Sequence, residues 1–303
     1  MKANVKIRYK YFSLILLIAN LYSCNPQTSS QIDETNSLID SLIQINKINE
    51  RTIVVVFGAD AISAINTDDG IVVIDAGIST GITKKIRKTI EDEFKSNNFS
   101  YVINTHAHPD HYGGNSVFSE SKIIGHVNGL KEIDERLVDS EKALSALGSI
   151  VNEYELELQS SQMNSDKWIS ACKQKTRYQY AYNDLKNLVP IKKPNITFSD
   201  SLDISAGDIT FEMKYFGKCH SSSDILVYVP ELKILFSGDL IFQYGRPSIN
   251  DRTLSEKEQW YKAILWSEKR LQNVEKVITG HGQILSAEDL SSFLRIILEK
   301  GNT

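Results

Sequence analysis

The sequence predicts an α/β fold built from layers of strands and helices. Short runs rich in β-branched residues recur from about residue 52 onward, and amphipathic helix patterns follow them. The two kinds of pattern alternate in two similar rounds, with a long helical stretch between the rounds. Such alternation is typical of a layered α/β sandwich, because each sheet must cover its apolar face with another layer.

The first round begins with three strand patterns and a helix. The turn signal DDG (68–70) separates the second strand pattern from the third. Ser79 or Thr80 can cap the helix that follows, in which apolar residues recur at every fourth position from Ile82 to Phe94. The expected strands are TIVVVFG, AISAINT and IVVIDAG before this helix, and SYVIN and KIIG after it.

The helical stretch at about 129–190 is expected to be an insertion. It contains no proline before Pro190 and shows helical apolar spacing. We predict two long helices with a break near SSQMNSD (160–166), which form a hairpin over one edge of the domain. A ligand site in this stretch is the alternative.

The second round resumes with strands and closes with helices. A capping box from Ser255 to Glu258 predicts the start of a helix at about 255–273, and Ser286 can cap a terminal helix. The expected strands are NITF, ITFEMKYF, ILVYV and KILFSG before the first of these helices, and KVITG after it.

The first 24 residues have the pattern of an export signal. Four basic residues precede a short apolar run at 11–22, which is shorter than the roughly 20 residues needed to span a bilayer. The run ends in LYSC (21–24), which resembles the lipobox of bacterial lipoproteins. We therefore expect removal of residues 1–24 as a signal peptide, a lipid on Cys24 that anchors the chain to a membrane, and a polar tether over 25–50. An ordinary signal peptide or an uncleaved anchor is the alternative.

The composition fits a globular protein with a small-molecule substrate. Hydrophobic residues make up 41% of the 303 residues and charged residues 24%, which allows a sizeable core in one large domain or two small ones. The net charge of -4 becomes -8 when residues 1–24, with four basic and no acidic side chains, are removed. An acidic chain gives no support for a nucleic-acid partner. In the exported chain Cys172 and Cys219 can pair only with each other, and we predict that Cys219 is a small buried thiol.

Three of the six histidines lie in the stretch YVINTHAHPDHYGGN (101–115). His106 and His108 alternate on extended backbone at the end of a predicted strand, so their side chains point the same way and can bind one ion together. Asp110 and His111 can turn toward a second ion. Imidazole and carboxylate ligands suit zinc, with iron or manganese also allowed.

Three more potential ligands follow other predicted strands. His220 comes after ITFEMKYFG, Asp239 follows KILFSG, and His281 follows KVITG. Loops at strand ends are where sites in layered α/β proteins are usually built, so we expect these side chains to join the histidine cluster. His126 is left over and is assigned a surface or structural role.

These motifs resemble those of the metallo-β-lactamase-fold hydrolases. The resemblance covers about residues 50–290 and rests on VVIDAG, THAHPDHYGGN, GKCHSSSD, VPELKILFSGD and TGHG in this order. It implies a four-layer αββα sandwich over residues 51–303, with the helical hairpin inserted, and two zinc ions per chain. The implied ligands are His106, His108 and His220 for one ion, Asp110, His111 and His281 for the other, and Asp239 as the bridge.

The resemblance also implies hydrolysis by a hydroxide that the two metals hold. Asp110 would ligate and orient this nucleophile, and Tyr244 is a candidate donor to the oxyanion, with simple packing as its alternative. We expect a small ester, lactone, amide or related substrate in the cell envelope. Asp239 stands where β-lactamases with a cysteine ligand carry that cysteine, which makes β-lactam hydrolysis the second choice.

Functions of other classes remain open at this point. A mononuclear iron oxygenase of sulfur compounds shares the HxHxDH pattern but uses fewer protein ligands. A periplasmic metal-binding protein would hold the metal without turnover. The simplest alternative is that these polar residues only cap strand ends.

Overall fold

The structure is a computed structural model that describes most of the chain. Its two units are Met1–Gln44 and Ile45–Thr303, and the second holds the sandwich. The signal peptide, Cys24 and Tyr244 lie outside the described residues. No helix within the described residues is both long and apolar enough to cross a membrane. The described residues are 37, 39–241, 252–270 and 273–289.

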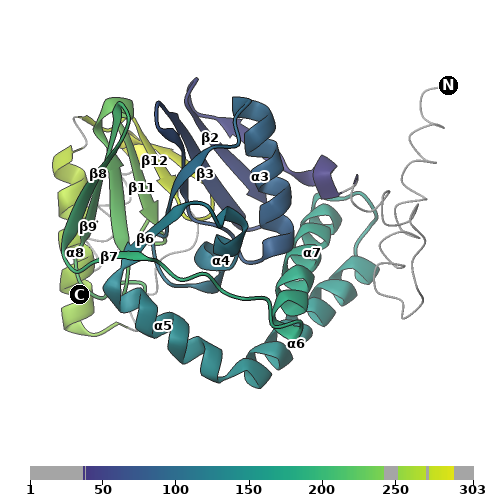
Figure 1. Ribbon diagram of the computed structural model, residues 1–303. Helices are drawn as coiled ribbons and strands as arrows, with labels where there is room; N and C mark the ends of the chain where they lie inside the picture. Colours follow the sequence, from purple (N-terminus) through teal and green to yellow (C-terminus); the bar gives the residue numbers. More distant parts are fainter. Residues whose placement is uncertain (1–36, 38, 242–251, 271–272, 290–303) are drawn as a thin grey trace. The chain divides into compact units, whose positions relative to one another are not determined.

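One sheet has seven strands in the order β1-β2-β3-β4-β5-β6-β7 (Figure 1). β2, β3 and β4 pair antiparallel, whereas β4, β5, β6 and β7 run parallel. The carboxyl ends of β4, β5 and β6 therefore meet at one edge, where ligand sites form in such sheets. The strands are β1 (Gln44–Lys47), β2 (Thr52–Phe57), β3 (Asp60–Thr67), β4 (Gly70–Ile74), β5 (Phe99–Ile103), β6 (Lys122–His126) and β7 (Ile196–Phe198).

The other sheet has six strands in the order β13-β12-β11-β10-β9-β8. β11 and β12 are its parallel pair, and the remaining neighbours are antiparallel. The ends of β11 and β12 thus also lie at one edge. The strands are β8 (Ser201–Ala206), β9 (Ile209–Tyr215), β10 (Ile225–Val229), β11 (Ile234–Gly238), β12 (Lys276–Thr279) and β13 (Ile284–Ser286).

The core lies between the two sheets. Both sheets turn β-branched and aromatic side chains toward each other, and these side chains form one apolar cluster. Burial of this apolar surface, at about 25 cal/mol per Å², is the main force that holds the sheets together. The cluster includes Val54, Ile65, Val72 and Ile103 from the first sheet and Phe211, Val227, Phe236 and Ile278 from the second.

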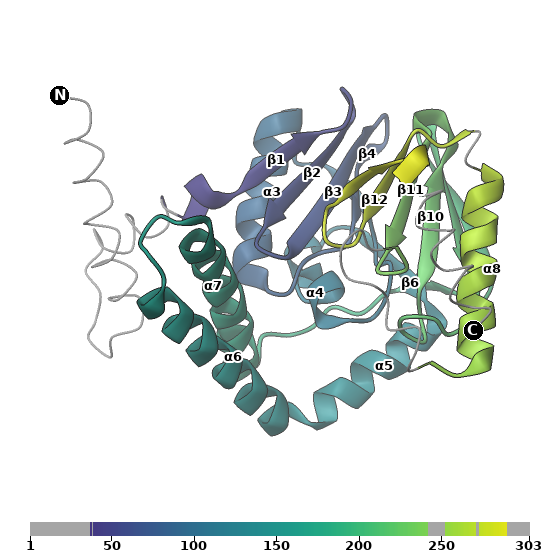
Figure 2. The same cartoon turned by 180° about the vertical axis from the view of Figure 1, so that it is seen from behind.

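One helix covers the outer face of each sheet (Figures 1 and 2). α3 (Thr80–Phe94) buries Ile82, Ile86 and Ile90 and is capped by Ser79, as predicted. α8 (Leu254–Arg270) packs Trp260 among the apolar residues of the second sheet. The four-layer αββα sandwich predicted from the sequence is confirmed.

The capping box of α8 was predicted two residues too late. Thr253, not Ser255, accepts a hydrogen bond from the backbone N–H of Glu256 at 3.3 Å, and the Glu256 carboxylate accepts one from the backbone N–H of Thr253 at 2.8 Å. The TLSE segment satisfies the S/T-x-x-E rule as well as SEKE does, so the local pattern alone does not choose between them.

The insertion has three helices where two were predicted. α5 (Val127–Val138) ends at Asp139, α6 (Ser140–Ser160) starts directly after it, and α7 (Asp166–Lys186) returns antiparallel to α6 (Figure 2). No glycine or proline marks the bend at Asp139, where the backbone leaves helical geometry at ψ 40°, so helical periodicity alone did not reveal it. The predicted break at 160–166 is confirmed.

The tether prediction of 25–50 extended too far. Residues 44–47 form β1, the edge strand beside β2, and residues 39–42 are helical. All four residues of β1 are exposed, so the strand has no apolar alternation that the sequence could display.

Candidate metal centre

All seven predicted ligands lie together at the strand ends of the two sheets. They form three overlapping groups of three residues, and within each group the ligand atoms lie within 4.8 Å of one another. His106 and His108 follow β5, Asp110 and His111 lie on the short helix α4 (Pro109–Tyr112), His220 follows β9, Asp239 follows β11 and His281 follows β12.

His106, His108 and His220 form the first ligand group. The Nε2 atom of His220 and the Nδ1 atom of His108 are 3.0 Å apart. The rings of His106 and His108 lie edge to face, with centroids 4.6 Å apart. Three imidazole nitrogens thus converge on one point, as the alternating positions in the HAH segment predict.

Asp110, His111 and His281 form the second ligand group. The Asp75 carboxylate lies 2.8 Å from Nδ1 of His111, and the Ala59 carbonyl lies 2.8 Å from Nδ1 of His281. In each case the outer nitrogen has a partner in the fold, which leaves Nε2 for the centre. Outer partners of this kind orient the histidines of metal sites.

Asp239 lies between the two groups. Its Oδ2 atom is 3.5 Å from Nε2 of His220 and 3.2 Å from Nε2 of His281, and its Oδ1 atom is 3.6 Å from Nε2 of His111. One carboxylate therefore faces histidines of both groups, which is the position of the predicted bridge.

The cluster has the properties of a site that holds metal ions. Nε2 of His106, Nε2 of His111 and Oδ1 of Asp239 are buried, and none has a hydrogen-bond partner among the described residues. Orphaned buried polar atoms are costly unless a ligand satisfies them. Gly280 also keeps the space open, since a Cβ atom there would lie 2.2 Å from Oδ1 of Asp239. Nitrogen and carboxylate ligands in this number fit zinc.

The two groups differ in charge. Burial lowers the pKa of each histidine in the first group, to about 4 for His108. Burial alone would also lower the pKa values of His111 and His281, but neighbouring carboxylates outweigh it and raise both, that of His111 well above its usual range. The first group therefore favours neutral imidazoles, whereas the carboxylates of the second group favour protonated ones.

Residues 58–281 match the family model described as the metallo-beta-lactamase superfamily. The chain belongs to this superfamily. Curated relatives of the chain are named metallo-beta-lactamases.

Curated relatives resemble the chain in sequence and solved structures resemble it in fold, both at low identity. The metallo-beta-lactamase type 2 of Bacillus cereus is 23% identical over 257 residues, which is 83% of this chain and 79% of the relative. The metallo-beta-lactamase from Pontibacter korlensis superposes with a TM-score of 0.54 at 17% identity, covering 84% of this chain and 99% of that chain. A sec-alkylsulfatase from Pseudomonas sp. superposes with a TM-score of 0.63 at 14% identity, covering 89% of this chain and 43% of that chain.

Within this superfamily fold, glycines let the chain pass close to the centre. An added Cβ would lie 2.3 Å from the Ile78 carbonyl at Gly113 and 2.1 Å from the Thr83 hydroxyl at Gly114. The glycine pair after the histidine cluster is thus required by close packing, because neither residue has a positive φ.

The loop after His220 is held by the insertion. Glu132 of α5 accepts hydrogen bonds from the backbone N–H of Ser222 at 2.9 Å and from the Ser223 hydroxyl at 2.7 Å. The same Ser223 hydroxyl accepts one from the backbone N–H of Ala107 at 3.0 Å. The SSSD segment therefore connects both histidine loops of the first group to α5.

Some residues that shape the centre were not found from the sequence. Asp75 lies in the VVIDAG motif directly after a strand, and this position was the available signal. Glu132 and Arg177 lie within helical patterns that gave no signal. Conversely, His126 lies outside the ligand groups. It is buried and its ring stacks on that of Tyr215 with centroids 3.7 Å apart. Of the two roles expected from the sequence, surface or structural, the structural one fits. Cys219 is a buried free thiol, as predicted.

A cavity of about 1010 Å³ adjoins the second ligand group. It lies between α4 and the three helices of the insertion, and most of its lining is apolar. Asp110 and Arg177 also line it, so one cavity wall is shared with the centre. Apolar residues of the lining include Ile78, Leu147, Ala181, Leu185, Val189 and Ile191.

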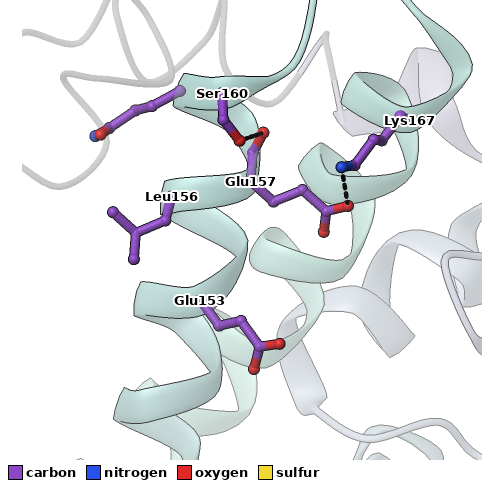
Figure 3. Close-up of a pocket in the computed structure, with 6 residues that line it drawn as sticks. Glu153, Leu156, Glu157, Ser160 and Lys167 are labelled. Carbon is purple, nitrogen blue, oxygen red and sulfur yellow. Dashed lines mark hydrogen bonds and ion pairs between the residues drawn. The ribbon is translucent and has the colours of Figure 1, made fainter.

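A second hollow, at the far end of the hairpin, has a different character (Figure 3). Its side chains are mostly charged or polar, and Lys167 pairs with Glu157 at 3.6 Å across it. It contains none of the seven candidate ligands. The cavity beside Asp110 is therefore the better candidate for a substrate pocket. The hollow is lined by Glu153, Leu156, Glu157, Gln159, Ser160 and Lys167.

Proposed function

We propose that the chain is a zinc-dependent hydrolase with a two-metal centre. The observation that carries this proposal is the pair of three-residue ligand groups on either side of Asp239, with buried nitrogens that have no hydrogen-bond partner among the described residues. When bound, two zinc ions supply an activated water as nucleophile and polarise the substrate oxygen.

The chain's own groups would serve this reaction in two ways. Asp110 presents its Oδ1 atom toward the second group, 3.8 Å from Nε2 of His111. Burial would raise the pKa of Asp110, but His111 and Arg177 lower it, so the carboxylate is ionised and can accept and pass on the proton of the attacking water. Asp75 and the Ala59 carbonyl hold the rings of the second group in place.

We assign the non-reacting part of the substrate to the cavity beside Asp110. Its size and apolar lining suit the acyl or alkyl part of a small ester, lactone or amide. Substitution of Ala181 by Phe should narrow the cavity and raise KM for longer acyl chains, while short substrates retain their kcat/KM. Leu156→Phe, in the separate hollow of the same hairpin, is the matched control and should change neither. Equal effects of Ala181→Phe on short and long substrates would rule the assignment out.

β-Lactam hydrolysis is the second candidate. Curated relatives from Bacillus cereus and Bacteroides fragilis are both named metallo-beta-lactamase type 2, the latter at 25% identity over 114 residues. A β-lactam is a cyclic amide, so the same attack on a carbonyl would open it. Turnover of a β-lactam faster than of any ester, lactone or thioester would make it the first choice.

The decisive experiment combines metal analysis with a substrate panel of lactam, lactone, ester, thioester and phosphodiester. The purified mature protein should bind two zinc ions, and His108→Ala should abolish hydrolysis. His126→Ala is the control for loss of a histidine, because His126 lies outside the ligand groups. One iron with oxygen consumption would instead indicate the oxygenase, and two zinc ions with no turnover of any substrate would indicate a binding protein.

We further propose that the protein is exported and lipid-anchored in the cell envelope. The basic residues, the apolar run at 11–22 and the LYSC segment support this proposal. Cys24→Ser should release the protein from the membrane fraction. Unchanged membrane association would contradict the lipid anchor.

A further inference from the structure

A buried arginine from the insertion reaches the second ligand group. Arg177 lies on α7 and is 2% exposed. Its Nε atom donates to Oδ1 of Asp60 at 2.8 Å, and its Nη2 atom donates to Oδ2 of Asp110 at 3.1 Å. One guanidinium therefore joins the start of β3 to a predicted metal ligand on α4. A guanidinium suits this position because its planar fork presents several donors in fixed directions.

The two oxygens of Asp110 have different neighbours. Oδ2 accepts the hydrogen bond from Arg177, whereas Oδ1 is the oxygen nearer to Nε2 of His111, at 3.8 Å. The guanidinium thus occupies one oxygen and turns the other toward the ligand group. Without it, the carboxylate can rotate about its last side-chain bond, which has a broad torsional minimum.

Arg177 is held in place because α7 packs against the start of α3. Asp184, two turns further along α7, accepts hydrogen bonds from the backbone N–H of Thr80 at 2.6 Å and from the Thr80 hydroxyl at 3.0 Å. The Tyr180 ring packs so closely on Gly81 that a Cβ atom there would lie 2.0 Å from it. These contacts fix α7 against the start of α3, so the guanidinium is preorganised.

We propose that Arg177 is a positioning residue for the second metal and that α7 completes this metal site from outside the sandwich. The inference rests on the proposed two-metal function. Arg177 orients Asp110 and leaves the first ligand group alone, because its hydrogen bonds go to Asp60 and Asp110 and to none of His106, His108 and His220. Its loss should therefore weaken one of the two metals and spare the other.

The test compares three variants of the full mature protein. Arg177→Met removes the donors, and Arg177→Lys restores the charge without the fork. Lys175→Met is the matched control, since Lys175 is equally buried on the same helix but pairs with Glu155 of α6. Chelator competition and native mass spectrometry measure the affinity and number of zinc ions, and thermal unfolding of the metal-free proteins checks that each variant folds.

Arg177→Met should weaken binding of one zinc ion by about 10- to 100-fold and leave the other unchanged, because loss of an outer partner of a ligand has that effect. Arg177→Lys should restore part of the loss, and Lys175→Met should bind as the wild type does. If Arg177→Met fails to fold, the partial loss in Arg177→Lys carries the test. Two zinc ions of wild-type affinity in both arginine variants, or equal loss of both ions, overturns the positioning role. A wild-type protein that binds fewer than two zinc ions overturns the two-metal function itself.

Discussion

The two ligand groups of the centre differ in the pKa values of their histidines and in the helix of the insertion that contacts them. The first consists of three histidines whose pKa values are all lowered, so it is neutral and ready for a metal without loss of protons. The second places two histidines of raised pKa beside carboxylates, so a metal ion would compete with protons there. Both groups depend on the insertion, but through different helices: Glu132 of α5 holds the His220 loop, and Arg177 of α7 holds Asp110. We therefore expect the two groups to differ in how strongly pH and outer contacts affect metal binding.

The largest expected effect is the loss of zinc binding by both ligand groups. Asp239 faces both groups, so Asp239→Asn should weaken both zinc ions and lower kcat/KM by more than about 100-fold, beyond the usual cost of an outer partner. Zinc content and hydrolysis of the best panel substrate measure this. Asp203→Asn, at an exposed position of β8, is the control and should change neither. Loss of only one zinc ion would show that Asp239 belongs to a single group.

Filling the space beside Asp239 should also affect both groups. A Cβ at Gly280 would lie 2.2 Å from Oδ1 of Asp239 and 2.8 Å from Cε1 of His111, so Gly280→Ala should displace both side chains. We expect about 1–3 kcal/mol lower stability and weaker zinc binding. The control is Gly148→Ala on α6, where the added Cβ meets a Tyr182 ring carbon at an ordinary 3.6 Å. Normal zinc content in Gly280→Ala would mean that the centre tolerates this shift.

The pH should separate the two groups. Zinc competes with protons for His111 and His281, so the affinity of the second group should fall as the pH drops through their raised pKa values. The first group should keep its affinity further into acid, because the pKa of His108 is about 4. Zinc titration by calorimetry in two buffers of different ionisation enthalpy counts the protons released. If both zinc ions released the same number of protons on binding, the proposed difference in protonation between the two groups would be wrong.

The smallest expected effect concerns the first group alone. Glu132→Gln keeps the shape of the side chain but weakens the hydrogen bonds to Ser222 and Ser223, so the zinc ion at His220 should bind about 10-fold more weakly. Glu135→Gln, at an exposed position of the same helix, should leave the affinity for zinc unchanged. Glu132→Gln and Arg177→Met thus each disturb one outer contact, the first at the first ligand group and the second at the second. A loss at the second zinc ion instead would show that the insertion acts on the centre as one unit.

The sequence predicted ten of the thirteen described strands, all but β1, β8 and β13, and it predicted which residues form the histidine and aspartate cluster, because these signals are local. Each ligand lies within a few residues of a β-branched run, and the alternation in HAH fixes the direction of two side chains. The outer contacts had no such signal. Arg177 meets Asp60 and Asp110 across 117 and 67 residues, and its place on α7 looks like any basic residue of a helix. Long-range pairs of this kind depend on how α7 packs on the core, which periodicity does not specify.

The errors at element boundaries have equally physical causes. The bend at Asp139 carries no helix breaker, and the two overlapping capping boxes before α8 satisfy the same rule. β1 is exposed on all its residues and therefore resembles a polar linker in sequence. In each case the choice is made by tertiary contacts or by backbone pairing.

The contact between Arg177 and Asp110 has a consequence for protein engineering. By its place in the chain the segment from α5 to α7 is an excursion between two neighbouring strands, β6 and β7, and a short loop in its place would leave every strand and all seven ligands present. Such a trimmed protein would lack the hydrogen bond from Arg177 to Asp110 and the hydrogen bonds from the His220 loop to Glu132. A shorter version of this chain therefore needs a new donor for Asp110 and a new acceptor for the His220 loop, not merely a shorter connection.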